Sequence, residues 1–109
     1  MNKMSLDAVA NEQLDRAVAA DSGRSADTVF GGHERALRQT VIAMRGGAAL
    51  AEHESPGEAT VFVLRGRVSL RCDSEAWEGR KGDLLIVPDA RHSLEAHEDS
   101  AVLLTVVKN

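Results

Sequence analysis

Two histidines in similar sequence surroundings are the residues of this chain best suited to chemistry. His53 lies in the pattern Gly47-x5-His53, and His92 ends the segment that begins at Gly82 and turns at Pro88. In both places short apolar stretches are joined by glycine or proline turns, and each place supplies one imidazole. An imidazole donates and accepts protons near neutral pH and is a common metal ligand. The pair therefore indicates either metal coordination or hydrogen bonding to a ligand.

Alternation along the two segments predicts where these histidines point. Over residues 91–97, His92 shares one strand face with Leu94, whereas the other face is mostly polar, so we expect His92 to face inward. The residues around His53 are mostly small: Ala49, Ala51, Ser55 and Ala59. Small inward side chains leave space unless a neighbour fills it, which predicts a cavity beside His53.

The elements that must position the histidines are one helix and a series of short strands. Apolar residues at three- and four-residue spacing predict an amphipathic helix from residue 5 to about 20, with Ser5 as its N-cap. From about residue 26 the period changes to two. The expected strands are 26–30, 36–44, 48–53, 59–64, 67–72, 75–78, 84–87, 92–96 and 101–107. This pattern predicts an all-β jelly roll over residues 25–109, preceded by a helix and linker over residues 1–24.

Composition limits the classes of function. The chain has 109 residues, 43% of them hydrophobic and 28% charged, which suits one globular domain. No apolar run is long enough for a membrane span, and the first residues lack the apolar core of a signal peptide. A single cysteine, Cys72, fits a reducing cytoplasm. The net charge of −4 and only three aromatic residues argue against nucleic-acid binding.

Apolar side chains that one small domain would leave exposed to solvent predict a homodimer. Residues 101–107 are apolar on both faces, so this strand is expected to be buried on both sides, in part by a second subunit. The amphipathic helix also needs a surface, either on the outside of the β-structure or on a partner.

The first histidine segment resembles the first motif of the cupin superfamily, which has the form G-x5-H-x-H-x(3 or 4)-E-x6-G. Gly47, His53 and Gly66 match this motif. Ser55 stands where the family has its second histidine, and Ala59 stands where it has a metal-binding glutamate. Two of the four usual metal ligands are therefore replaced.

The second segment resembles the second cupin motif, which has the form G-x5-P-x-G-x2-H-x3-N. Gly82, Pro88 and His92 match, with one residue fewer before the histidine. Ala90 replaces the glycine and Ala96 replaces the asparagine. The matching glycines and proline, together with the alternation, indicate a cupin-type jelly-roll β-barrel. The set of metal ligands typical of the family is incomplete.

The resemblance covers residues 36–107 and implies a small-molecule ligand in the barrel, together with a weakly held divalent metal such as iron, manganese, nickel or zinc. Two histidines and one carboxylate form a known iron triad, so Glu58, beside the vacated glutamate position, is the expected third ligand after His53 and His92. The strand position of Gln39 also suggests an inward polar contact. The expected pocket comprises Gln39, His53, Ser55, Ala59, Val61 and His92.

Three classes of function remain open at this point. The first is a small cupin that binds an organic ligand. The second is a mononuclear metal enzyme of the dioxygenase, isomerase or decarboxylase type. The third is a dimeric interaction or sensor module without catalysis. The chain has no tyrosine, which sets aside the cupin-like epimerases with a tyrosine acid, and the sequence identifies no catalytic residue.

Overall fold

The computed structural model describes residues 2–53 and 57–108, with the backbone alone at His53. It contains one helix and nine strands, which confirms the predicted all-β jelly roll with an N-terminal helix. The elements are α1 (Leu6–Ala19), β1 (Arg24–Phe30), β2 (Leu37–Met44), β3 (Ala49–His53), β4 (Gly57–Arg65), β5 (Arg67–Cys72), β6 (Glu75–Arg80), β7 (Leu84–Ile86), β8 (His92–Ala96) and β9 (Ser100–Lys108). Each predicted strand is present, with small shifts at the ends.

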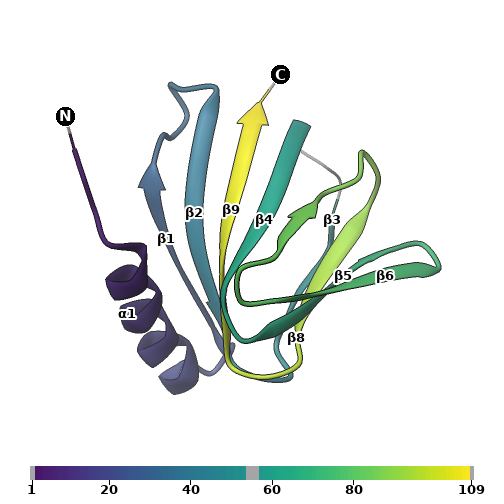
Figure 1. The fold of residues 1–109 in the computed structure, drawn as a ribbon, viewed down its shortest axis with the longest axis horizontal. Coiled ribbons are helices and arrows are strands. Elements are labelled where there is room, and N and C mark those ends of the chain that lie inside the picture. Colours follow the sequence, from purple (N-terminus) through teal and green to yellow (C-terminus); the bar gives the residue numbers. More distant parts are fainter. Residues whose placement is uncertain (1, 54–56, 109) are drawn as a thin grey trace.

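The strands form two antiparallel sheets that pack face to face. One sheet has five strands in the order β1-β2-β9-β4-β7, and the other has four in the order β3-β8-β5-β6. Figure 1 shows the sheets close together at the bottom and spread apart at the top, so they form an open sandwich and not a closed ring. We call the spread end, which carries the β1–β2 loop and the end of β9, the open end.

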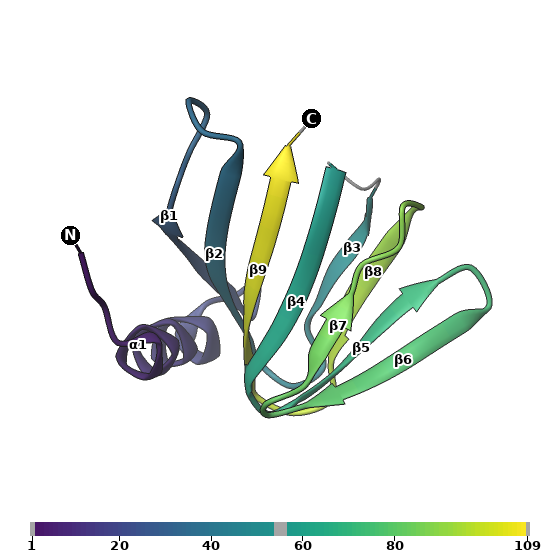
Figure 2. The same cartoon turned by 45° about the horizontal axis from the view of Figure 1, so that its top comes forward.

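Helix α1 covers part of the outer face of the five-stranded sheet. The Ser5 Oγ accepts a hydrogen bond from the Ala8 amide at 3.2 Å, which caps the first turn. The buried Ala10 and Ala17 pack against the outward side of β2 and β9, at Val41 and Ala101 among others. Figures 1 and 2 both place α1 beside β1 and β2 and away from β7. The helix therefore covers one half of this face.

A separate core fills the space between the two sheets. Alternate residues of each strand point inward, so that β4 contributes Val61 and Val63 while β9 contributes Val102 and Val106. The four-stranded sheet contributes Leu70, among others, from the opposite side. Burying side chains of this kind stabilises the fold by roughly 1.5–3 kcal/mol each. Within residues 2–53 and 57–108, no helix is long and apolar enough to cross a bilayer.

Candidate functional site

The two histidine segments meet as neighbouring strands of the four-stranded sheet. In the antiparallel pair of β3 and β8, the backbone of His53 lies directly opposite that of His92, after a register irregularity between Leu50 and His53. Opposite residues of an antiparallel pair share one face of the sheet. The fold therefore brings together two residues that are far apart in the sequence, at the open end of the sandwich. We call this pair the histidine rung.

The ring of His92 is buried and held in one tautomer. Only 6% of the residue is exposed. Its Nδ1 lies 2.8 Å from the carbonyl oxygen of Ala90. A carbonyl oxygen only accepts, so Nδ1 carries the proton, and the lone pair of the neutral ring lies on Nε2. A histidine that donates through one nitrogen to a backbone carbonyl is oriented for binding through the other.

His92 forms part of the wall of a small cavity between the sheets. The cavity has a volume of about 40 Å³. It is lined by Ile42, Leu50, Val61, Leu70, Val87, His92, Leu94, Val102 and Leu104. Such a space holds a water molecule or two, whereas pockets for drug-sized ligands span roughly 300–1,000 Å³. Among the described side chains of this lining, His92 is polar and the others are aliphatic.

Two of the expected pocket residues lie on the inner side of β4. Val61 lines the cavity, and Ala59 is 8% exposed and belongs to the same core. Ser55 lies outside the described residues. Among the described residues, the cavity beside Val61 is small, because aliphatic side chains from both sheets fill the interior.

Gln39 lies on the other face of its strand. It lines a hollow with Met4, Phe30 and Leu103 on the outer side of the five-stranded sheet. Its Nε2 donates to the Thr105 hydroxyl at 3.2 Å. This corrects the expectation of an inward Gln39. The reason is that β2 carries apolar residues on both faces, because α1 covers its outer face. The apolar neighbours of Gln39 in the sequence therefore do not show which face of β2 points into the interior.

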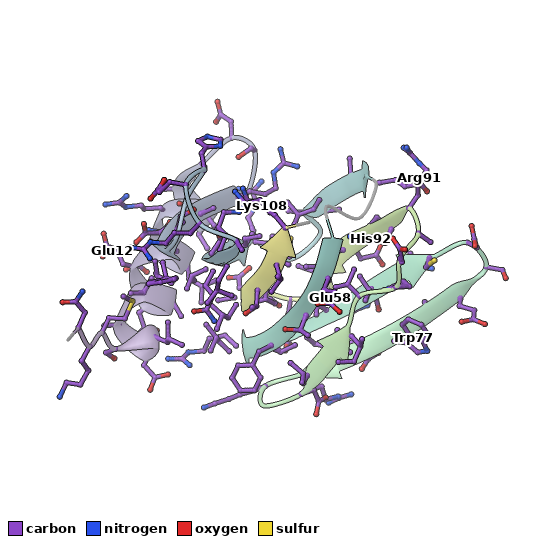
Figure 3. The ribbon with its side chains drawn as sticks, turned by 90° about the horizontal axis from the view of Figure 1, so that it is seen from above. Glu12, Glu58, Trp77, Arg91, His92 and Lys108 are labelled. Carbon is purple, nitrogen blue, oxygen red and sulfur yellow. The ribbon has the colours of Figure 1, made fainter. Side chains whose placement is uncertain are left out.

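Glu58 also lies away from the histidine rung. It is exposed and alternates with the buried Ala59 and Val61, which places it on the outer face with Thr60. Figure 3 shows Glu58 on β4 and His92 on β8, which belong to different sheets. This corrects the expectation that Glu58 completes a ligand triad. Among the side chains that the structure describes, no group of three or more His, Cys, Asp or Glu could hold a metal ion.

An ion pair next to the histidine rung was not predicted. Arg91 Nε lies 2.9 Å from Glu52 Oε1, linking the residue before His92 to the residue before His53. Both side chains are more than half exposed, so the pair contributes at most about 1 kcal/mol. The sequence carried no signal for it, because the two residues meet only through the pairing of β3 with β8.

Cys72 provides a test of the local electrostatics. It is a free, partly exposed thiol at the end of β5. Burial raises the pKa of this thiol, and the carboxylates of Asp73, Glu75 and Glu52 raise the pKa further, because both effects disfavour the thiolate.

We therefore expect Cys72 to react with a disulfide reagent more slowly than free cysteine at pH 8, and the midpoint of its rate-against-pH curve to lie at higher pH. The measurement is the reaction rate as a function of pH, and Asp73→Asn should speed the reaction. A rate profile identical to that of free cysteine would contradict this environment.

The architecture and the histidine rung define a class: a small jelly-roll sandwich whose two motif segments converge on one inner position. A family model described as "Cupin domain" matches residues 40–108. The chain therefore belongs to the cupin family, as the two motifs indicated. A search of curated proteins finds no match.

Solved structures support the same fold. A conserved protein of unknown function from Streptococcus pyogenes is 28% identical, with a TM-score of 0.73 over 83% of this chain and 78% of that one. A "cupin 2 conserved barrel domain protein" from Leptotrichia buccalis is 25% identical, with a TM-score of 0.73 over 82% of this chain and 43% of that one. The salicylate 1,2-dioxygenase of Pseudoaminobacter salicylatoxidans is 18% identical, with a TM-score of 0.77 over 92% of this chain and 32% of that one. At 18% identity the last likeness concerns the fold alone.

Proposed function

We propose that this cupin binds a small molecule at the histidine rung, with His92 as the polar contact. The observation that carries the proposal is the orientation of the buried His92 ring, whose Nδ1 is bonded to the Ala90 carbonyl and whose Nε2 therefore bears the lone pair. Binding sites are typically apolar with a few well-placed polar groups. An imidazole acceptor in the wall of an aliphatic cavity matches that description.

The lining suggests the chemistry of the ligand. A hydroxyl, amine or protonated carboxyl group would donate a hydrogen bond to His92 Nε2, while a short apolar body would contact aliphatic side chains such as Leu50 and Leu94. The cavity of about 40 Å³ accommodates only the tip of such a molecule. The rest of the ligand would lie toward the open end of the sandwich, where β8 begins.

The histidine rung also favours a second ligand, a weakly held divalent metal. His92 presents Nε2, and the backbone register sets His53 opposite. Two imidazoles suit zinc, iron or nickel, but the described carboxylates do not complete the set, since Glu58 lies on the outer face. These residues fit an ion held by two nitrogen ligands and water. When bound, such an ion supplies a Lewis acid that attracts oxygen atoms of a ligand.

The His92→Ala variant tests both ligands. In untagged protein we expect zinc or nickel, titrated by calorimetry, to bind at least about 10-fold more weakly to His92→Ala than to the parent. Small alcohols, amines and acids that raise the melting temperature of the parent should lose that effect in His92→Ala, because binding to the folded state stabilises it. His33→Ala, which removes an exposed histidine from the β1–β2 loop, is the matched control and should leave both results unchanged.

The outcomes separate the two ligands. Loss of metal binding alone assigns the histidine rung to the ion, and loss of the organic hits alone assigns it to the small molecule. If His92→Ala binds the metals and the organic compounds as tightly as the parent does, the site is not at His92.

A further inference from the structure

The outer face of the four-stranded sheet carries a serine, a histidine and a glutamate side by side. Ser69 lies on β5, and its neighbours Val68 and Leu70 point into the core between the sheets, so Ser69 points outward. Register places Glu95 of β8 directly beside Ser69. The ring of His97, the residue after β8, reaches the same face, because its Nε2 lies 2.6 Å from Ser69 Oγ. These three side chains lie on the side of the sheet opposite to the inner cavity and its histidine.

The contact between Ser69 and His97 joins a hydroxyl to a base. On the other side of the imidazole ring, His97 Nδ1 lies 4.0 Å from Glu95 Oε1. A carboxylate attracts the ring nitrogen that bears a proton, so the favoured neutral tautomer carries its proton on Nδ1. The Ser69 hydroxyl then donates its hydrogen bond to Nε2. This is the orientation in which an imidazole can take the proton of the hydroxyl as a general base.

Two guanidinium groups flank Ser69 along the same face of its strand. Arg67 and Arg71 stand two residues before and after it. Arg71 Nη2 lies 3.3 Å from Glu95 Oε1, and Arg67 Nη1 lies 3.3 Å from Glu78 Oε2. A guanidinium has five N–H donors, so these contacts leave donors for the oxygen of an acyl group at Ser69. Such donors stabilise the negative charge that develops on a carbonyl oxygen under attack.

We propose that Ser69 is a nucleophile activated by His97, and that this face of the sheet transfers small acyl groups from activated esters to water. A nucleophile within hydrogen-bond reach of a base, with a third group beside the base, is the arrangement that nucleophilic catalysis requires. Because Ser69 is only 6% exposed, the acyl group must be small, such as acetyl. The ester must also have a good leaving group, such as a phenolate.

The reaction has two steps. In the first, Ser69 Oγ forms a bond to the carbonyl carbon while its proton moves to His97 Nε2, and the bond from that carbon to the leaving oxygen breaks as this oxygen takes the proton from His97. In the second, a water molecule gives a proton to Nε2 and attacks the acyl carbon. The carboxylic acid then leaves, and Ser69 regains its proton. Glu95 stabilises the imidazolium that forms in both steps, so it is a positioning residue.

The experiment uses a small alkyl fluorophosphonate, which bonds to an activated serine oxygen with loss of fluoride. Peptide mass spectrometry of the labelled parent should place the adduct on Ser69, and Ser69→Ala should carry none there or elsewhere. His97→Gln keeps a hydrogen-bonding side chain but removes the base, so labelling of Ser69 should slow by about 100-fold or more. Glu95→Gln should slow labelling less, with an unchanged urea midpoint, because the pairs that it loses are exposed.

Ser93→Ala is the matched control. Ser93 also lies on the outer face, paired with Arg71, and has no histidine contact among the described side chains, so its loss should leave labelling unchanged. Labelling of other residues alone, no labelling at all, or equal labelling of the parent and His97→Gln overturns the activated serine. With p-nitrophenyl acetate, the parent should release many equivalents of nitrophenolate and Ser69→Ala far fewer. A parent that releases one equivalent and stops overturns the transfer to water.

Discussion

Gly66→Ala is expected to destabilise the fold strongly, because the substitution combines a left-handed backbone with a crowded position. Gly66 joins β4 to β5, where the chain passes from one sheet to the other, and its φ is +78°. A Cβ at this position would overlap the Ser100 hydroxyl and the Asp99 carbonyl oxygen. Ser100 is fully buried, and its Oγ accepts from the Arg67 amide at 3.0 Å and donates to the Glu98 carbonyl at 2.7 Å. This network cannot move aside without losing hydrogen bonds.

The expected cost combines two physical effects. Left-handed backbone at an alanine costs about 1–2 kcal/mol, and displacing the Ser100 network adds the loss of buried hydrogen bonds, for a total of about 3 kcal/mol or more. Gly82→Ala is the matched control, because Gly82 has a φ of +92° but no atom within 4 Å of an added Cβ. Urea unfolding of both variants measures the difference in the free energy of unfolding. Equal losses in the two variants would show that crowding at Gly66 is unimportant.

Leu70→Ala is expected to cost about 3–4 kcal/mol of unfolding free energy. Leu70 is 1% exposed and packs between the sheets, in the wall of the cavity beside His92. Truncation removes buried methyl groups and enlarges a cavity that is already present. The loss includes the cost of the larger cavity, because surrounding side chains relax only partly into such a space.

The control for this prediction is Val18→Ala, at an apolar residue of α1 that is 47% exposed. It should change the free energy of unfolding by less than about 0.5 kcal/mol, because alanine favours the helix and little burial is lost. Urea or thermal unfolding gives both values. A loss below about 1 kcal/mol for Leu70→Ala would mean that the interior is not packed as the two sheets suggest.

The strands could be predicted from the sequence because local signals agreed. Glycine and proline residues such as Gly66 and Gly82 predict the turns, and the alternation of apolar and polar residues between them predicts the strands. The helix was equally clear, with Ser5 capping its first turn. These signals depend on neighbouring residues alone, so the fold needed no information on distant contacts.

The site could be predicted only in part, because alternation gives two faces without saying which is interior. In β2, Val41 is buried under α1 and Ile42 is buried between the sheets, so both faces look like a core in the sequence. Gln39 was assigned to the wrong side for this reason. The cavity lining also depends on residues from both sheets, such as Leu50 and Leu104, whose meeting only the tertiary structure reveals.

The place of β9 in the sheet order has a consequence for how the chain reaches its native state. Although β9 comes after every other strand in the described chain, it lies in the middle of its sheet, between β2 and β4. Val102, for example, pairs with Ile42 on one side and with Val63 on the other. Until this strand emerges from the ribosome, β2 and β4 have no shared neighbour and their inner edges stay unpaired. Such high contact order predicts slow folding that begins only after β9 has been synthesised, with those edges open to aggregation until then.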